Sequence, residues 1–443
     1  MNSYLKFLFA LVVLSVISSC DGFLDEKPSK SLVVPSSLND IQAILDTESL
    51  LNQESAVLFL QSDDFELLDP AMVEASQWQR DAMFWNGDIE NPSGVTLEYA
   101  YYYQKIFYSN LVLELLEKEV GENREKEKDL KGQALFYRAF GYWTLAQLYM
   151  PAYHKGKDLQ EGILPYRMSS QIDLKVPLAT VSQIYKTIVE DLEESISLLP
   201  DKATYVTRPS LAAASGLLSR IKLSMGDYQG ALDDAESALQ ISSDLMDYNL
   251  LDLESYYPIS LFNPEVIFHG ELSSHSFIYS NSIVAHKEIY DSYDSLDLRK
   301  QVYFIENTEG LPNFRGSYTG SYEFFSGISV DELLLTAAEC SARLGDVSGG
   351  MAYLNQLLVT RWVHGTYVPV ETENAKVALD LIVMERRKSL PFRGVRWMDL
   401  QRLSQEPNYN KVLIRESGGT SGSLDLSQAS YALKIPTREV NLE

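Results

Sequence analysis

The densest group of side chains that could do chemistry lies near the C-terminus, where residues 384–403 read MERRKSLPFRGVRWMDLQRL. Arginine forks in such a stretch can clamp a carboxylate or a phosphate. The alternative, which we favour, is an ion-pair network that fixes the turn between two helices, because buried charges persist only when they are paired. The basic residues are Arg386, Arg387, Lys388, Arg393, Arg396 and Arg402, and the acidic residues are Glu385 and Asp399.

Large aromatic side chains gather in two stretches where the helical pattern fades, residues 61–96 and 245–325. Their flat faces can stack on sugar rings or contact peptides, and their polar edges can hydrogen-bond. The alternative is that they fold back over the core, since exposed aromatic rings are unfavourable without a use. The candidate ligand-binding residues are Trp78, Trp85, Tyr256, Tyr257, Tyr279, Tyr318 and Tyr322.

The sequence lacks the common catalytic motifs. No HExxH, GxSxG, GxGxxG or GxxxxGK[ST] string is present, and the histidines lack metal-ligand spacing. With 62 acidic residues, some carboxylate pair suited to glycoside hydrolysis always exists, so the sequence nominates none. Ca²⁺ at Asp63 and Asp64 is a bare possibility, and Gly418, Gly419 and Gly422 predict a flexible loop rather than a phosphate site. We therefore expect no enzyme and no cofactor.

Two stretches with the same helix–turn–helix pattern would position these side chains. Residues 211–239 predict two short helices, because apolar residues recur every three or four positions on either side of a Gly-Asp pair at 226–227. Glycine can adopt the left-handed backbone that closes a helix, and aspartate can cap the next one. The plan returns at 330–358 with Gly-Asp at 345–346. Such units resemble tetratricopeptide pairs, which must stack to bury their faces, although a plain helical bundle is the alternative.

Longer helices are expected over 99–118, 124–150 and 181–199, and the second is apolar nearly all round, which predicts a central position. Ser37 with Asp40 three residues later predicts the cap of the first helix. Cys340 has no disulfide partner and falls on an apolar helix face, so we expect a small buried hydrophobic residue.

The N-terminus reads as an export signal. Residues 1–19 carry one lysine and a short apolar run that ends in two serines before Cys20, too short to span a bilayer comfortably. This order resembles a bacterial lipoprotein signal, in which Cys20 becomes lipidated; an ordinary secretory signal is the alternative. Residues 20–36 contain two prolines and several serines, which predicts an extended tether.

The overall charge excludes one class of partner. The formal net charge is −25 over 443 residues. Nucleic-acid binding requires concentrated Lys and Arg to displace counterions, and this surface repels phosphates at long range. We therefore expect no nucleic-acid partner.

The C-terminal stretch also carries a family resemblance. It is similar to the signature of the SusD/RagB family of outer-membrane nutrient-binding lipoproteins, together with the lipoprotein start followed by FLDEKP, the unit ending at residues 223–227 and the ending KIPTREVNL. Pro391 stands where the family more often has alanine. The matching residues are Glu385, Arg386, Arg387, Leu390, Phe392, Gly394, Arg396, Trp397, Asp399, Leu400 and Arg402, with Tyr137, Arg138 and Ala139 further upstream.

The resemblance implies an all-α, SusD-like fold in which four tetratricopeptide-like helical pairs pack against a loop-rich irregular part. The pairs would be 126–199, 209–240, 330–361 and about 375–405, within a single domain spanning 37–443 with insertions at about 61–96, 151–179 and 245–325.

The resemblance also implies a function. A family member of this kind lies on the outer surface of a Bacteroidetes-type bacterium, anchored by lipid, and presents a glycan or peptide to a SusC-like TonB-dependent transporter without catalysis of its own. The alternative is a repeat-scaffold lipoprotein that binds a protein partner in outer-membrane assembly and takes no nutrient.

Overall fold

The computed structural model describes residues 35, 37–86, 97–118, 123–156, 161–273, 276–427 and 431–435. The chain divides into two compact units, Met1–Ile41 and Gln42–Glu443. The expected signal segment, Cys20 and nearly all of the expected tether lie outside the described residues. The predicted helix cap is confirmed, because α2 (Leu38–Leu45) begins after Ser37, whose Oγ accepts a hydrogen bond from the amide of Asp40 at 3.2 Å.

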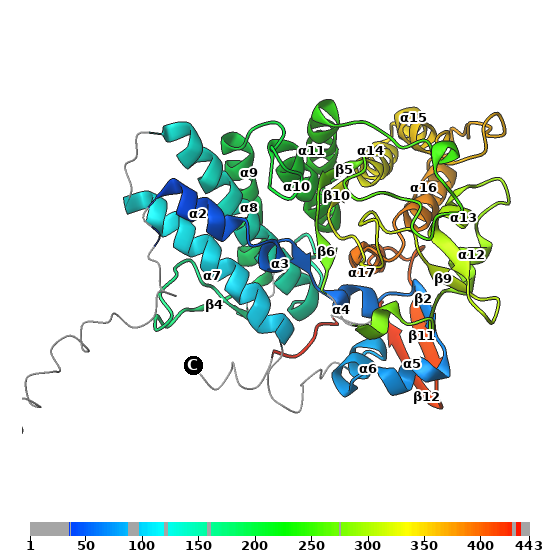
Figure 1. The fold of residues 1–443 in the computed structure, drawn as a ribbon, viewed down its shortest axis with the longest axis horizontal. Coiled ribbons are helices and arrows are strands. Elements are labelled where there is room, and N and C mark those ends of the chain that lie inside the picture. Colours follow the sequence, from blue (N-terminus) through cyan, green and yellow to red (C-terminus); the bar gives the residue numbers. More distant parts are fainter. Residues whose placement is uncertain are drawn as a thin grey trace, which may run out of the picture. The chain divides into compact units, whose positions relative to one another are not determined.

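The expected helical pairs are confirmed. In Figure 1 they follow one another from α8 and α9 through the green pair α10 and α11 to the yellow and orange helices α14 to α17. Consecutive pairs pack together, since α9 contacts α10, α11 contacts α14, and α14 contacts α16. The helices are α7 (Leu97–Lys118), α8 (Arg124–Tyr149), α9 (Val181–Leu198), α10 (Leu211–Met225), α11 (Tyr228–Ile241), α14 (Val330–Leu344), α15 (Val347–Leu358), α16 (Ala375–Ser389) and α17 (Val395–Leu403).

The two Gly-Asp turns have the predicted geometry. Gly226 and Gly345 close α10 and α14 in the left-handed conformation, with φ of 72° and 97°. Asp227 and Asp346 then cap α11 and α15, each accepting from the backbone amide three residues later, at 3.3 and 2.8 Å. Each glycine is therefore required by its backbone, and each aspartate satisfies an amide that the next helix leaves unpaired.

The interior of the helical part is centred on α8, as predicted. Its residues from Gly132 to Tyr149 are all buried, in contact with α7 on one side and α9 on the other. Cys340 is completely buried, beside Leu223 and Ala231, and burial raises the pKa of its thiol to about 12. The expectation of a small buried hydrophobic residue is confirmed.

The predicted insertions contain short elements. Among the described residues the short helices are α3 (Glu48–Leu51), α4 (Ala56–Leu60), α5 (Asp69–Glu74), α6 (Gln77–Met83), α12 (Lys287–Asp291) and α13 (Arg299–Tyr303), with 3-10 turns at Tyr248–Leu250 and Ser276–Tyr279. Short strands pair two by two. The pairs are β1 (Gln53–Glu54) with β6 (Glu271–Leu272), β2 (Phe65–Leu67) with β7 (Ile283–Ala285), β3 (Leu164–Pro165) with β4 (Leu178–Ala179), β5 (Val266–Phe268) with β10 (Ile328–Ser329), β8 (Phe304–Glu306) with β9 (Pro312–Phe314), and β11 (Val412–Ser417) with β12 (Thr420–Asp425).

One loop prediction was wrong. The glycines at 418, 419 and 422 do not form a flexible loop, because β11 and β12 pair in register on both sides of them. Gly418 and Gly419 make the tight turn of this hairpin with φ of 55° and 75°, and Gly422 lies inside β12, opposite Arg415. A hairpin turn requires positive φ, which explains the first two glycines.

The arginine-rich stretch 384–403 forms a buried ion-pair network, so the hypothesis of an open anion clamp is wrong. Arg402 donates to both oxygens of Glu339 at 2.6 and 2.7 Å. Arg393 donates to Asp331 at 2.9 and 3.1 Å. Burial alone would raise the pKa of Glu339, but Arg402, Arg343 and Arg386 together outweigh burial and lower the pKa to about 2. Carboxylates of the chain therefore occupy the forks that an external anion would need.

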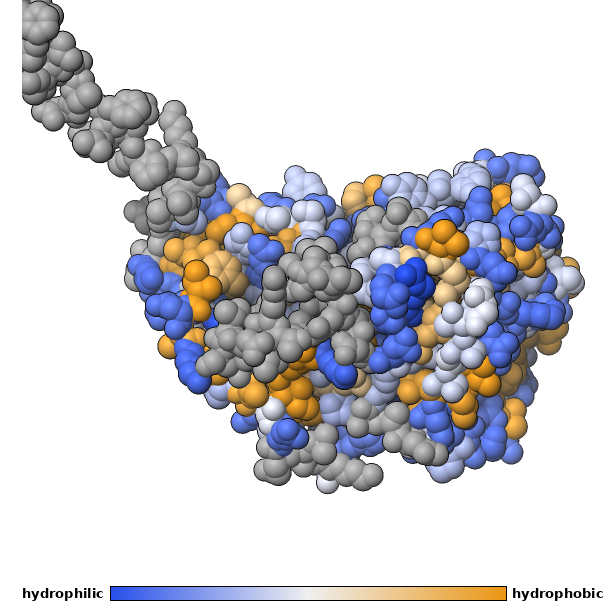
Figure 2. Space-filling model, turned by 90° about the horizontal axis from the view of Figure 1, so that it is seen from below, coloured by the Kyte–Doolittle hydropathy of each residue, from blue (hydrophilic) through white to orange (hydrophobic). Residues whose placement is uncertain are grey.

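The surface mixes polar and apolar residues. On the face drawn in Figure 2, apolar residues form separate groups among hydrophilic ones. Within the described residues no helix combines the length and the apolar character needed to cross a membrane.

Candidate functional site

Four tyrosines from three separate chain segments line one small pocket of the second unit, which we call the tyrosine pocket. They are Tyr256, Tyr257, Tyr279 and Tyr322, four of the residues proposed from the sequence. All come from the loop-rich stretch 245–325. The other lining residues are Ile278, Ser280, Asn281, Ile283, Asn313, Phe314, Phe324 and Phe392.

The tyrosines form two edge-to-face pairs. Tyr256 and Tyr257 have ring centroids 4.8 Å apart with planes at 79°, and Tyr279 and Tyr322 have centroids 4.9 Å apart with planes at 68°. Tyr256 is 57% exposed and Tyr322 is 53% exposed, whereas their partners are half-buried. Each pair therefore presents one accessible ring that is supported by a second ring.

Three phenylalanines form the base of the pocket. Phe314 stacks on Phe392 with centroids 4.5 Å apart and planes only 5° apart, and Phe324 meets Phe392 edge-on at 5.4 Å. Phe392 has φ of 62°, a left-handed conformation that non-glycine residues rarely adopt. Its ring is therefore directed toward the pocket from the stretch 384–403, the part of the chain with the family resemblance.

Amides supply the polar groups of the pocket. Asn313 is 9% exposed, and its Nδ2 donates to the carbonyl oxygens of Asn281 at 3.1 Å and Ile283 at 2.7 Å. These two acceptors fix the orientation of the amide. Its Oδ1 then has no hydrogen-bond partner among the described residues. A buried acceptor without a donor is unfavourable in the free protein.

The turn that carries Tyr322 is held by its own hydrogen bonds. Thr319 Oγ1 donates to the carbonyl oxygen of Glu323 at 2.8 Å, and Ser321 Oγ donates to the Glu323 carboxylate. Gly320 has φ of 68°, and a Cβ there would crowd the backbone of Leu261. The exposed ring of Tyr322 therefore projects from an ordered turn.

The two tryptophans do not line the pocket. Trp85 is 7% exposed, its Nε1 donates to the carbonyl oxygen of Gln61 at 3.0 Å, and Arg415 lies 5.0 Å from its ring. Trp78 lies half-buried on α6. The structure therefore places Trp85 in the alternative role considered from the sequence, as a ring that covers the core.

Tyr318 does not line the tyrosine pocket either, and it is fully buried. Its hydroxyl lies 2.6 Å from Glu265 Oε2 and 3.0 Å from Asp331 Oδ2, and Arg393 lies 4.0 Å from its ring. Burial raises the pKa of Tyr318 well above its ordinary value. Tyr318 therefore links the loop-rich part to the arginine network.

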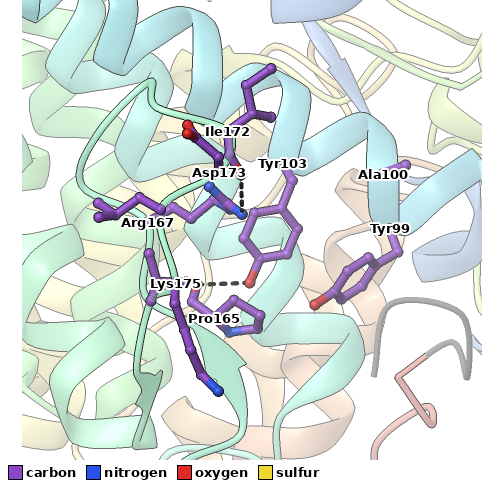
Figure 3. A pocket seen from close by; sticks show the side chains of 10 residues that line it. Tyr99, Ala100, Tyr103, Pro165, Arg167, Ile172, Asp173 and Lys175 are labelled. Atoms are coloured by element: carbon purple, nitrogen blue, oxygen red, sulfur yellow. Dashed lines mark hydrogen bonds between the residues drawn. The ribbon is translucent and has the colours of Figure 1, made fainter. Parts of the chain in front are cut away.

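A larger pocket of about 540 Å³ lies between α7 and the insertion 165–176 (Figure 3). Tyr103 faces into it, and its hydroxyl donates to the carbonyl oxygen of Pro165 at 2.9 Å. Arg167 donates to the carbonyl oxygens of Gln171 and Ile172. Tyr99 is only 2% exposed, so its face is not available for stacking. This pocket has the volume of a ligand site, and the ring that faces into it, Tyr103, is half-buried.

Asp63 and Asp64, considered from the sequence as a possible Ca²⁺ site, lie among arginine and lysine side chains. Asp63 accepts from Arg396 at 2.7 Å and from Lys411 at 2.8 Å. Burial alone would raise the pKa of Asp63, but Arg396, Arg387 and Lys411 outweigh burial and hold it well below its usual range. Within the described residues, no three His, Cys, Asp or Glu side chains are grouped to hold a metal ion.

Sequence reasoning missed the non-tyrosine half of the pocket. Asn281 and Asn313 have no spacing that marks them, since their position depends on strands that meet only in the folded chain. Phe392 was noticed only as part of the family resemblance. Its position in the turn from Pro391 to Gly394, within a charged stretch, was the one available signal that its ring would be buried.

Three comparisons relate this chain to known proteins. Residues 22–223 match the family model SusD-like_3, described as "Starch-binding associating with outer membrane". SusD-like protein P2 of Formosa agariphila is 23% identical over 356 residues, which cover 64% of this chain and 67% of that protein.

Solved structures share the fold. A SusD superfamily protein of Bacteroides thetaiotaomicron superposes with a TM-score of 0.74 at 21% identity, covering 92% of this chain and 98% of that one. A protein described as a laminarin-binding SusD-like protein superposes with a TM-score of 0.65 at 18% identity, covering 91% and 97%. The expected resemblance and the mostly helical SusD-like fold are confirmed.

Proposed function

We propose that this chain, whose residues 22–223 match a SusD-like family model and whose fold matches that of SusD superfamily structures, captures a glycan at the cell surface and delivers it to a TonB-dependent transporter in the outer membrane. SusD family proteins are non-catalytic binding proteins associated with the outer membrane. The present chain would bind its ligand in the tyrosine pocket and leave it chemically unchanged.

The observation that carries this proposal is the convergence of Tyr256, Tyr257, Tyr279 and Tyr322 around one pocket. Exposed tyrosine rings stack on the apolar faces of sugars, and a few polar groups then fix the orientation. None of the lining side chains is charged. An uncharged glycan therefore suits the pocket better than a sulfated or carboxylated one, and a peptide is the second ligand class.

The cell-surface part of the proposal has separate support. The order of apolar run, serines and Cys20 resembles a lipoprotein signal, and the family description names the outer membrane. We infer that Cys20 carries the lipid anchor and that a SusC-like transporter is the partner. The solved structure described as a laminarin-binding SusD-like protein supports a glycan as the ligand class.

Calorimetric titration of residues 21–443 tests the glycan site. The panel contains laminarin, starch, a carboxymethylated form of each, and oligopeptides. We expect saturable binding of an uncharged glycan, and we expect Tyr256→Ala and Tyr322→Ala each to weaken it about fivefold, because loss of a stacking ring costs about 1 kcal/mol.

Tyr205→Ala is the matched control, because Tyr205 is 59% exposed and does not line the pocket. Equal binding by all variants would place the site elsewhere. Binding of the peptides alone would replace glycan with peptide as the ligand. Absence of any binding would favour the alternative, a repeat scaffold that binds a protein partner in outer-membrane assembly.

A further inference from the structure

Three consecutive residues, Asn313, Phe314 and Arg315, each contact a different part of the tyrosine pocket. Asn313 and Phe314 end β9, and Arg315 follows at once. The backbone is itself fixed, because β9 pairs with β8 and the Arg315 amide donates to the carbonyl oxygen of Tyr303 at 2.7 Å. Anything these side chains hold is therefore held relative to one short, rigid segment.

Arg315 holds the loop that carries Tyr256 and Tyr257. Its Nη1 donates to the carbonyl oxygen of Ser255 at 2.9 Å, and its Nη2 donates to that of Leu253 at 3.1 Å. Nη2 also donates to the carbonyl oxygen of Gln301 at 2.6 Å. The planar guanidinium thus joins the tyrosine loop to α13 through bonds of fixed direction.

This arrangement is unusual for a buried cation. Arg315 is 8% exposed, yet no Asp or Glu of the described residues forms an ion pair with it. Burial lowers its pKa, and Glu254 offsets this only in part. A buried charge that meets only carbonyl oxygens, and whose Nε has no hydrogen-bond partner among the described residues, is costly, so it points to a requirement for the loop geometry rather than for stability.

Asn313 and Phe314 act on the opposite side of the pocket. Asn313 Nδ2 donates to the carbonyl oxygens of Asn281 and Ile283, which follow Tyr279 in the chain. The Phe314 ring forms the base by stacking on Phe392. The two tyrosine-bearing loops are separate in sequence, and this segment is connected to both of them.

We propose that Arg315 is a positioning residue of the tyrosine pocket: it holds the loop 253–257 at the distance from the Asn313-bound loop that a ligand requires, without touching the ligand. That a glycan is the ligand of this pocket rests on the proposed function. The loop geometry is a property of the free protein.

A double-mutant cycle tests this role in the glycan titration. Arg315→Met removes the hydrogen-bonding fork and keeps much of the side-chain length, and we expect it to weaken binding about tenfold. If Arg315 acts through the tyrosine loop, it adds less than about twofold in a Tyr256→Ala background, because residues that act as a unit are not additive. Full additivity would overturn the proposal. Arg315→Lys separates charge from geometry, and wild-type affinity in that variant would also overturn it.

Hydrogen exchange of the free protein decides the geometric part whether or not a glycan binds. We expect Arg315→Met to speed exchange in a peptide covering residues 253–258 at least about tenfold while residues 211–241 keep their protection. The matched control is Arg415→Met, because Arg415 is also buried and donates to three carbonyl oxygens, those of Leu60, Ser62 and Met83.

The two failures are distinguishable. Tyrosine variants that bind like wild type overturn the proposed site, and the exchange result still decides the role of Arg315. If the tyrosine variants bind weakly but the Arg315→Met protein has normal affinity and normal exchange, only the positioning role is overturned. Faster exchange at 253–258 in the Arg415→Met protein would reduce the effect to general loosening and also overturn it.

Discussion

At the residue scale, the arginine network shows what the charged signature does. Glu339 has no exposed surface and accepts from both Arg402 and Arg343, so its carboxylate is ionised in the folded protein although burial alone opposes ionisation. Because the pairs are buried, salt screens them little, unlike those at the surface. The network thus holds α14 to α17 through charges that only a change of protonation or sequence can remove.

Glu339→Gln should therefore destabilise the protein by about 3–5 kcal/mol at pH 7, the usual cost of breaking a buried pair. The folded pKa of Glu339 is lowered to about 2, so its stabilising contribution is present above the unfolded value and disappears as pH falls toward 2. The difference between wild type and variant should shrink over that range. Urea unfolding from pH 7 to pH 3 measures it.

The control is Glu194→Gln at the exposed pair with Lys131, where both side chains are about half exposed. Its effect should stay within about 1 kcal/mol. A Glu339→Gln protein as stable as wild type at pH 7, or a difference that grows in acid, would contradict the role assigned to the pair.

At the element scale, the Gly-Asp turns set the angle between paired helices. Gly226→Ala and Gly345→Ala should each cost about 1–2 kcal/mol, because alanine is strained at positive φ. No atom other than the Tyr228 hydroxyl lies within 4 Å of a Cβ at position 226, and none lies so near at 345, so backbone strain alone is measured. Thermal unfolding beside Gln240→Ala, an exposed change in α11, checks the prediction; a cost equal to that control would contradict it.

The same elements show how far the sequence could lead. Helical pairs were predictable because the repeat of apolar residues and the Gly-Asp break are both local signals. The stretch 245–325 was predictable as a loop-rich insertion because the helical pattern fades there, and its use in binding stays a prediction. Which of its tyrosines are exposed was not predictable, because exposure depends on tertiary contacts. Tyr318 is buried beside the carboxylates of Glu265 and Asp331, whereas Tyr322 is exposed to solvent.

At the scale of the whole molecule, the net charge bears on how the protein can attach to a membrane. A chain of formal charge −25 is repelled by anionic membranes and glycans, so attachment to a membrane has to come from a lipid or a partner rather than from surface charge. A negative field also disfavours polyanionic ligands before they reach the pocket. Both effects agree with a lipid-anchored receptor for an uncharged glycan.

Cys20→Ser should therefore release the protein from the outer-membrane fraction, because the thiol that would carry the lipid is gone. Fractionation with metabolic labelling by a radioactive fatty acid measures this. Cys340→Ser is the control, because that thiol is buried in the fold and should leave anchoring unchanged. Continued fatty-acid labelling of the Cys20→Ser protein would contradict the lipoprotein assignment.

The contacts around Asp63 also set an order of events during synthesis. Its partners Arg396 and Lys411 follow Asp63 by 333 and 348 residues. Arg415, which donates to the carbonyl oxygen of Leu60, follows that residue by 355 positions. A ribosome that makes the chain from its N-terminus leaves this early segment without partners until translation is nearly complete. The segment around Asp63 therefore acquires these hydrogen bonds only after the hairpin of β11 and β12 has been made, so this part of the fold is completed last.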